Sequence, residues 1–278
     1  MTTQTTAMIR TEIRKIDGLD IRIAMSAEDT GQTAQALLLA PWPESLYAFE
    51  PTWRQLAAKA RLIAVDLPGF GHSERRDALM APRAMGEFIL RLADEFGLER
   101  PHVVGPDIGT AASLFAAAMA PGRFRSLAIG SGGVAFPLQL GPPLKDRVEA
   151  PSLDAFRGID GREAVKPSMA RLERYQLSDA AREDYLSAYA GDRFVESIRY
   201  VRAYPQELPI LAELLKDIHT PVKLLWGARD TVVPLANAEF LLERLPQAEL
   251  AALDATHFVW EDAADEYAKQ LIAFWDRT

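Results

Sequence analysis

Three stretches of the sequence carry residues that could do chemistry together. Asp107 is the centre of Gly105-Pro106-Asp107-Ile108-Gly109, which follows two valines and precedes a run of small and apolar residues. Asp230 follows another apolar run, and His257 stands after the next one. A carboxylate is ionised near pH 7 and can attack carbon directly, and a histidine oriented by a second carboxylate can activate water. The three residues indicate attack at carbon, followed by hydrolysis of an enzyme ester.

The spacing around Asp107 is typical of a strand that turns directly into a helix. Such a turn raises the middle residue of a Gly-x-nucleophile-x-Gly pattern above the sheet edge, and the glycines permit the tight backbone. Alone, the pattern is weak, because glycine and aspartate are common in turns. Taken singly, Asp230 is equally explained as a turn cap before Pro234, and His257 as a hydrogen-bonded loop histidine. Their joint order, nucleophile then acid then histidine, is what makes the interpretation specific.

The elements that would position these residues alternate along the chain. Helical patterns fall between short apolar runs typical of strands buried on both faces. This alternation predicts an α/β fold with a mostly parallel central sheet flanked by helices. The expected strands are Ile21–Ala24, Ala36–Ala40, Leu62–Val65, His102–Val104, Ser126–Gly130, Val222–Trp226 and Glu249–Leu253, and the expected helices are Phe49–Lys59, Pro82–Phe96, Thr110–Ala120, Leu235–Arg244 and Glu261–Asp276.

The alternation stops between residues 134 and 218. This span begins with a proline-rich loop, continues with helix-like segments at Ala170–Tyr175 and Ala180–Ala190, and contains five of the seven tyrosines. We expect a helical cap over one end of the sheet, with a core domain formed by residues 1–133 and 219–278. The alternative is a helical extension packed elsewhere, whose tyrosines only pack on the faces of amphipathic helices.

The composition of the chain limits the classes of partner that we expect it to bind. The chain has 278 residues, 49% of them hydrophobic, and a formal charge of −8. The acidic balance argues against a nucleic-acid or anionic-membrane partner. No apolar run reaches the ~18 residues that a membrane span needs, and the first ten residues lack the features of a secretion signal. We therefore expect a cytoplasmic protein, and a homodimer is left open.

Metal and thiol chemistry are not expected. The chain has no cysteine and only four histidines, none of them in a His-x-x-x-His pattern. Disulfides, thiolate ligands and the common zinc motif are therefore excluded, and we expect no metal and no other cofactor.

Together these motifs resemble the α/β-hydrolase superfamily, most closely its epoxide-hydrolase and haloalkane-dehalogenase branch. The resemblance runs from about Ile21 to Trp275 and includes D-L-P-G-F-G-H-S, a widespread loop motif of the fold. An aspartate at the turn separates this branch from serine esterases and lipases. The resemblance implies that Asp107 is the nucleophile, Asp230 the acid and His257 the base, and that the backbone N–H groups of Trp42 and Ile108 form the oxyanion hole. Ala40-Pro41 replaces the usual His-Gly before Trp42, so the geometry of that hole needs testing.

The same branch separates two chemistries by their hydrogen-bond donors. Dehalogenases usually carry a tryptophan after the nucleophile, whereas Ile108 stands here, and Trp42 would supply only one donor. Epoxide hydrolases use cap tyrosines as acids, and Tyr200 stands where the second of these is expected. The first is missing near positions 152–157, and Tyr175 is a substitute from another part of the cap.

The resulting expectation is hydrolysis of an epoxide to a diol, with a small apolar organic substrate and water as partners. Haloalkane or haloacid dehalogenation and ester or lactone hydrolysis remain alternatives. An alternative of another class is a ligand-binding protein that kept the hydrolase scaffold, which the altered Ala40-Pro41-Trp42-Pro43 loop favours.

Overall fold

A computed structural model describes residues 9–27 and 34–278, so most of the stretch on which the expectation about secretion rests lies outside the described residues. In these ranges eight strands form one sheet in the order β1-β2-β4-β3-β5-β6-β7-β8. The strands are β1 Thr11–Ile16, β2 Leu19–Met25, β3 Gln35–Leu39, β4 Arg61–Val65, β5 His102–Pro106, β6 Ser126–Gly130, β7 Val222–Gly227 and β8 Ala248–Leu253. The predicted α/β fold is confirmed, and seven of these strands fall where the sequence places them.

The direction of the strands explains where the site lies. β1 and β2 run antiparallel to their neighbours, whereas β3 to β8 pair in parallel. Every residue of β5, β6 and β7 is buried, because helices cover both faces of the sheet. The carboxyl ends of parallel strands meet at one edge, where ligands bind in such sheets.

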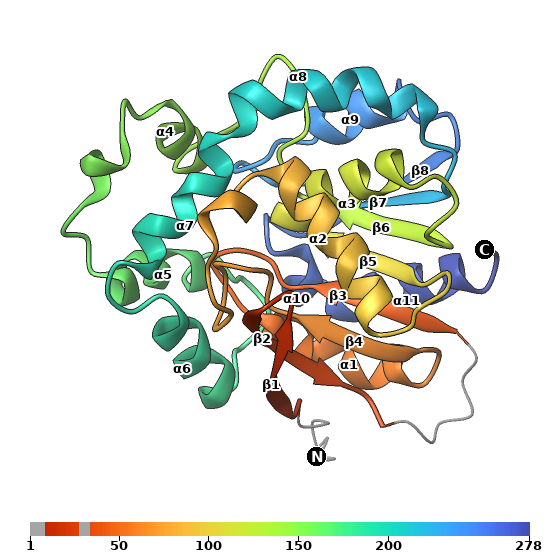
Figure 1. The fold of residues 1–278 in the computed structure, drawn as a ribbon, viewed down its shortest axis with the longest axis horizontal. Coiled ribbons are helices and arrows are strands. Elements are labelled where there is room, and N and C mark those ends of the chain that lie inside the picture. Colours follow the sequence, from red (N-terminus) through yellow and green to blue (C-terminus); the bar gives the residue numbers. More distant parts are fainter. Residues whose placement is uncertain (1–8, 28–33) are drawn as a thin grey trace.

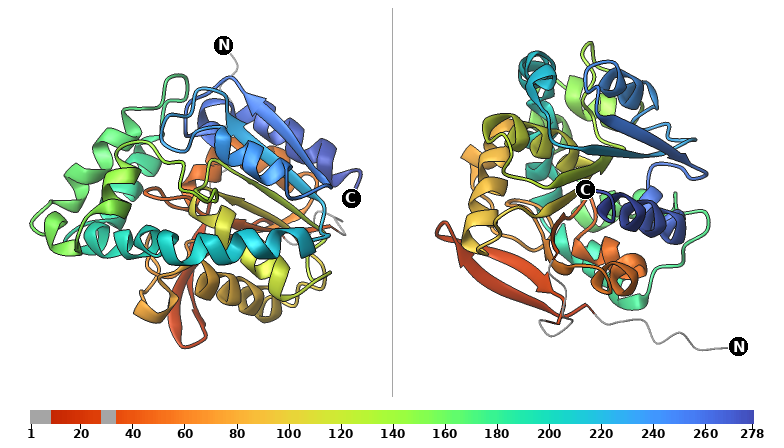
Figure 2. Two further views of the ribbon diagram at one scale, coloured as in Figure 1. Left: turned by 90° about the horizontal axis from the view of Figure 1, so that it is seen from above. Right: turned by 90° about the vertical axis from the view of Figure 1, so that its right-hand side faces the viewer.

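The helices form two layers around the sheet (Figures 1 and 2). α2, α3 and α9 share one apolar cluster with one face, while α1 and α11 share the other. None of the helices in the described ranges is both long enough and apolar enough to cross a bilayer. The helices of these layers are α1 Glu50–Ala57, α2 Pro82–Glu95, α3 Ile108–Met119, α9 Ala236–Leu242, α10 Val259–Asp262 and α11 Ala264–Trp275.

Five further helices lie between β6 and β7, within the span where the sequence pattern changes. They are α4 Leu144–Glu149, α5 Gly161–Met169, α6 Asp179–Ala188, α7 Arg193–Arg202 and α8 Tyr204–Leu214. α4 to α7 gather beyond one end of the sheet, and α8 runs back over α2 and α3 (Figures 1 and 2).

Two local expectations were wrong or incomplete. Ala170–Tyr175 is not a helix, because α5 ends at Met169 and the backbone N–H groups of residues 173–175 donate instead to the carboxylate of Asp262. β1 was not predicted, because five of its six residues are exposed at this sheet edge and Ile13 is the one large apolar side chain among those five.

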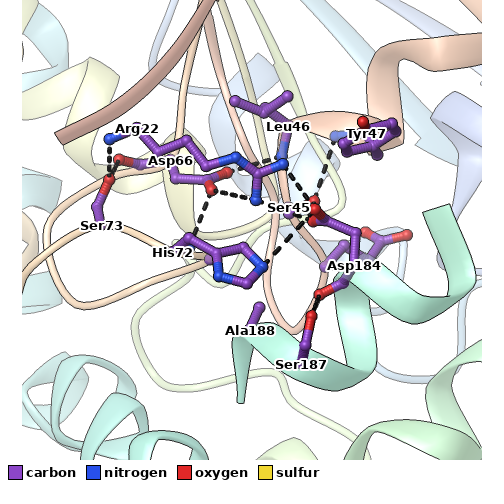
Figure 3. Close-up of polar contacts among 12 residues, drawn as sticks. Arg22, Ser45, Leu46, Tyr47, Asp66, His72, Ser73, Asp184, Ser187 and Ala188 are labelled. Atoms are coloured by element: carbon purple, nitrogen blue, oxygen red, sulfur yellow. Dashed lines mark hydrogen bonds and ion pairs between the residues drawn. The ribbon is translucent and has the colours of Figure 1, made fainter. Parts of the chain in front are cut away.

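An ion-pair network joins the segment between β6 and β7 to the core (Figure 3). Arg22 of β2 donates two hydrogen bonds to Asp184 of α6, at 3.0 and 2.7 Å, and its guanidinium lies 3.5 Å from buried Asp66. Ser45 also donates to Asp184, at 2.6 Å. The network ties α6 to the strand and loops beneath it.

Candidate active site

Asp107 stands at the turn between β5 and α3 in an unusual backbone conformation. Its φ is +50° and its ψ −117°, a left-handed region that side chains other than glycine rarely occupy. The close approach of α3 to β5 requires glycine at 105, where a Cβ would lie 2.5 Å from Ser113 Oγ and 2.9 Å from the Gly109 carbonyl. Strain of this kind is concentrated at functional sites.

Three strand ends bring Asp107, Asp230 and His257 together. His257 Nδ1 lies 2.9 Å from Asp230 Oδ2, and His257 Nε2 lies 3.7 Å from Asp107 Oδ1. The second oxygen of Asp230 accepts the backbone N–H groups of Val232 and Val233, at 2.8 and 2.9 Å. Asp230 is therefore fixed, and it orients the imidazole so that Nε2 faces Asp107.

Backbone N–H groups hold the other oxygen of Asp107. Trp42 N–H donates to Asp107 Oδ2 at 2.8 Å, and the N–H of Ile108 also stabilises the carboxylate. The loop that carries Ala40-Pro41 thus presents its N–H at the position expected for an oxyanion hole. One carboxylate oxygen is anchored, and the other points toward His257.

Burial changes the protonation of both partners. Burial raises the pKa of Asp107 to about 6, although His257 and the two backbone N–H groups oppose this shift. Burial lowers the pKa of His257, but the carboxylates of Asp230 and Asp107 outweigh it and leave the pKa above its ordinary value. Near pH 7 Asp107 is mainly ionised, as an attacking group requires.

A cavity of about 30 Å³ adjoins Asp107 and His257. Trp42, Val232 and Phe258 give part of its wall an apolar character, and Pro143 and Leu144 close it from the side of α4. Two arginines, Arg147 of α4 and Arg171 just after α5, complete the lining. A space of this size holds only a few water molecules, so a larger substrate enters only when side chains of the wall move.

Arg147 is held against aromatic rings. Its guanidinium carbon lies 4.9 Å from the ring centre of Trp42 and 5.0 Å from that of Phe194, within the range of cation–π attraction. Burial, and then the charge of Arg171, lower the pKa of Arg147 to about 10, so the side chain stays cationic near pH 7.

The side chains expected to contact substrate from the cap lie elsewhere. Tyr200 is fully buried, but its hydroxyl donates to the carbonyl of Ile108 at 2.8 Å, and Tyr200 is not among the cavity-lining residues. Tyr175 was misplaced: its hydroxyl donates to Glu50 at 3.4 Å, because the chain from 173 to 175 is drawn toward Asp262. The indole N–H of Trp42 donates to Ser197 at 2.8 Å, so only the ring of Trp42 faces the cavity.

The sequence reasoning missed Arg147 and Arg171. Both stand in the segment of weakest local pattern, where a single arginine is most often a solvated surface residue. The one sequence feature near Arg147 is the preceding Pro142-Pro143 pair, and a proline pair does not by itself indicate a cavity. No group of three or more His, Asp or Glu side chains suited to a metal ion occurs within residues 9–27 and 34–278.

Comparisons with known proteins identify the family of this fold. The family model for the alpha/beta hydrolase fold matches residues 37–264. A 2-hydroxy-6-oxononadienedioate/2-hydroxy-6-oxononatrienedioate hydrolase of Burkholderia vietnamiensis is 25% identical over 272 residues, which cover 93% of this chain and 92% of the relative. The dihydrolipoyllysine-residue acetyltransferase component of the acetoin cleaving system of Pseudomonas putida is 29% identical over 225 residues, which cover 79% of this chain but only 57% of that relative.

Solved structures are similar across nearly the whole chain. The epoxide hydrolase CorEH has a TM-score of 0.82 at 18% identity, covering 97% of this chain and 99% of its own. The epoxide hydrolase VrEH1 of Vigna radiata has a TM-score of 0.79 at 17% identity, covering 100% of both chains. At such identities the likeness establishes the fold. Since the family model covers most of the sequence, this chain belongs to the alpha/beta hydrolase fold family.

Proposed function

We propose that the protein is a hydrolase that forms an ester between Asp107 and a saturated carbon of its substrate. The main support is that the two oxygens of this carboxylate make different contacts. Oδ2 accepts the Trp42 N–H at 2.8 Å, while Oδ1 lies 3.7 Å from His257 Nε2. Oδ1 attacks, and Oδ2 becomes the carbonyl oxygen of the ester, already seated where charge develops when water attacks.

Ester formation prepares the second step. In the resting protein the charge of Asp107 is one of the causes that raise the pKa of His257. The ester removes that charge, so the pKa of His257 falls and its neutral form is favoured. Neutral His257 then takes a proton from water as the water attacks the ester carbonyl, and Asp230 stabilises the resulting imidazolium.

Among substrates of this mechanism, we propose an epoxide that is opened to a diol. The indole N–H of Trp42, the donor considered for a departing halide, is occupied by Ser197. The guanidinium groups in the cavity offer several N–H donors for the alkoxide that forms when an epoxide ring opens. The two similar epoxide hydrolases add support at the level of the fold.

We further propose that residues 134–218 act as a cap over a core of residues 1–133 and 219–278. Arg147 and Arg171 both come from this segment and line the cavity above Asp107. Substrate contacts would then come from the segment, while the reacting groups come from the strand ends. The partners proposed are a small organic substrate and water.

Isotope labelling tests the mechanism. A panel of small epoxides, haloalkanes and aryl esters identifies a substrate, with Asp107→Ala as the inactive control. A single turnover in ¹⁸O-water should then place label in the Asp107 carboxylate, because water attacks the ester carbonyl. Label in the product alone, with Asp107 unlabelled, would mean that water attacks the substrate directly and would refute the ester.

A further inference from the structure

The cavity beside Asp107 is lined by two cationic side chains. Arg147 and Arg171 both line it, and within residues 9–27 and 34–278 neither forms an ion pair at 4.0 Å or less. This is unusual in a chain whose formal charge is −8, where acidic partners outnumber basic ones. Exposed arginines of the same segment, such as Arg157 and Arg162, form ion pairs with acidic neighbours.

The two charges also act on each other and on the reacting groups. The charge of Arg171 lowers the pKa of both Arg147 and His257, and the charges of Asp107 and Asp146 oppose the effect on Arg147 only in part. Among the described residues that line the cavity, Asp107 is the one carboxylate, and its oxygens face Trp42 N–H and His257 rather than a guanidinium. Gathering two like charges in a partly dry space is unfavourable unless an anion enters between them.

Neighbouring aromatic side chains hold the guanidinium of Arg147 in place. Its guanidinium lies over the Trp42 and Phe194 rings, which are themselves stacked with centroids 5.6 Å apart. The Trp42 indole is fixed in turn by Ser197 at 2.8 Å. Aromatic faces hold the charge in place without using its N–H groups, which stay available to a ligand.

We propose that the substrate carries a carboxylate, which Arg147 and Arg171 bind while Asp107 attacks a neighbouring saturated carbon. This inference rests on the proposed function for its chemistry and names the substrate class: a small organic acid with an epoxide ring beside its carboxylate. A guanidinium binds a planar carboxylate through two parallel hydrogen bonds and so fixes its orientation as well as its position.

The reaction on such an acid balances without any further reactant. Asp107 Oδ1 forms a bond to a ring carbon, the carbon–oxygen bond breaks, and the ring oxygen takes a proton from water. A second water then attacks the ester carbonyl and transfers a proton to His257. As the Asp107–carbon ester opens, the leaving alkoxide takes the proton that remains on the attacking oxygen, which releases the diol acid and restores the carboxylate of Asp107. Protonated His257 returns its proton to the hydroxide that the first step left, so one water is consumed overall. The substrate carboxylate keeps its charge throughout.

Binding of an unreactive acid tests the inference apart from the chemistry. Propionate and propionamide have nearly the same shape, but only propionate is charged, and neither has a group that Asp107 can displace. Isothermal titration of the full-length protein should give propionate an affinity at least about 10-fold higher than propionamide, the range for one or two charge-assisted hydrogen bonds. The advantage should shrink as salt is added.

Variants locate the binding. Arg147→Met and Arg171→Met should each lose about 10-fold or more in propionate affinity, without a change for propionamide, while Arg147→Lys and Arg171→Lys keep part of it. Arg157→Met, in the same segment but exposed and paired with Asp154, is the matched control and should bind as wild type. Thermal unfolding of each variant verifies that it is folded.

Three outcomes would overturn the inference. They are equal affinity for propionate and propionamide, unchanged propionate binding in both folded methionine variants, and clearly tighter binding of inorganic phosphate than of propionate. The last would make the anion a phosphate. If propionate binds as expected but oxirane-2-carboxylate is not turned over, the anion site stands and the proposed epoxide chemistry fails. If only uncharged epoxides are turned over, the anion site fails and the chemistry stands.

Discussion

Two regions of the molecule bury arginine, and they do it in different ways. Arg22 is 5% exposed and meets two carboxylates, with hydrogen bonds of 3.0 and 2.7 Å to Asp184 and a 3.5 Å contact to Asp66. Arg147 meets aromatic rings, and of the neighbouring charges that of Arg171 affects its pKa most, ahead of those of Asp107 and Asp146. Arg22 belongs to β2 and contacts the segment between β6 and β7 through Asp184, whereas Arg147 is part of that segment.

The difference separates an arginine that serves the fold from one that serves a ligand. Arg22 finds its anions within the chain, in Asp66 and Asp184, and its ion pair with Asp184 fixes α6 to the core. Where the chain supplies only rings, the charge is oriented but left without a counter-ion. An anion that binds to such charges in the folded protein raises the stability of the fold.

The largest expected effect concerns the paired arginine. Arg22→Met leaves buried Asp66 and half-buried Asp184 without their cation, and should lower the free energy of unfolding by about 3 kcal/mol or more. Urea unfolding at pH 7.5 measures it. A change below about 1 kcal/mol would mean that the network in Figure 3 contributes little.

The same variant should depend on pH. Burial raises the pKa of Asp66 to about 6, and Arg22 opposes that shift. A carboxyl whose folded pKa is raised gives stability below its unfolded pKa, near 4, and loses it as pH rises through the folded pKa. Removing Arg22 raises the folded pKa further and leaves the unfolded pKa unchanged, so the loss caused by Arg22→Met should grow as pH rises above about 6, where Asp66 is ionised in the wild type. A pH-independent loss would contradict this account.

The second buried carboxylate, Asp107, should show its titration in rate rather than in stability. Its pKa of about 6 predicts that the rate of ester formation falls as pH drops through 6, approaching tenfold per pH unit well below it. Rapid-mixing kinetics of the first turnover between pH 5 and 8 measure this limb. A rate that stays constant down to pH 5 would rule out Asp107 as the attacking group.

A smaller effect is expected from the ring beneath Arg147. Trp42→Phe keeps the backbone N–H and an aromatic face but removes the hydrogen bond to Ser197, and should lower stability by about 1 kcal/mol. Turnover of an epoxide should fall less than about tenfold. A loss of a thousandfold would indicate that the indole N–H acts on a leaving group, as dehalogenation requires.

The smallest expected effect is the change in stability when Arg147 or Arg171 is replaced. Arg147→Met and Arg171→Met remove charges that lack a carboxylate partner, so the midpoint of urea unfolding should stay the same or rise slightly. A destabilisation as large as that of Arg22→Met would place these arginines in the same structural class as Arg22 and remove the basis of the comparison.

Periodicity and motif order predict the core of this fold well. The turn at Asp107 follows β5 and Asp230 follows β7, and both strands are buried along their whole length, whereas β8, before His257, is an edge strand with a single buried residue. The parallel pairing of β5, β6 and β7 then brings their carboxyl ends to one edge, so chain order alone indicates which side chains meet.

The helical segment could not be predicted in the same way. Tyr175 was misplaced because a tertiary contact, Asp262 with the backbone of residues 173–175, ends the helical pattern there. Arg147 and Arg171 were missed because their meeting depends on how α4 and the end of α5 pack over the sheet. Local propensity carries no information about that packing.

Esterification of Asp107 is the central step of the proposed mechanism. His257→Gln removes the base that activates water but leaves the anchored carboxylate intact, so the ester should form and persist. With an epoxide that the wild type turns over, intact-protein mass spectrometry should show an adduct of the substrate's mass, and peptide mapping should place it on Asp107. An inactive His257→Gln protein that remains unmodified under these conditions, or an adduct on another residue, would contradict the account.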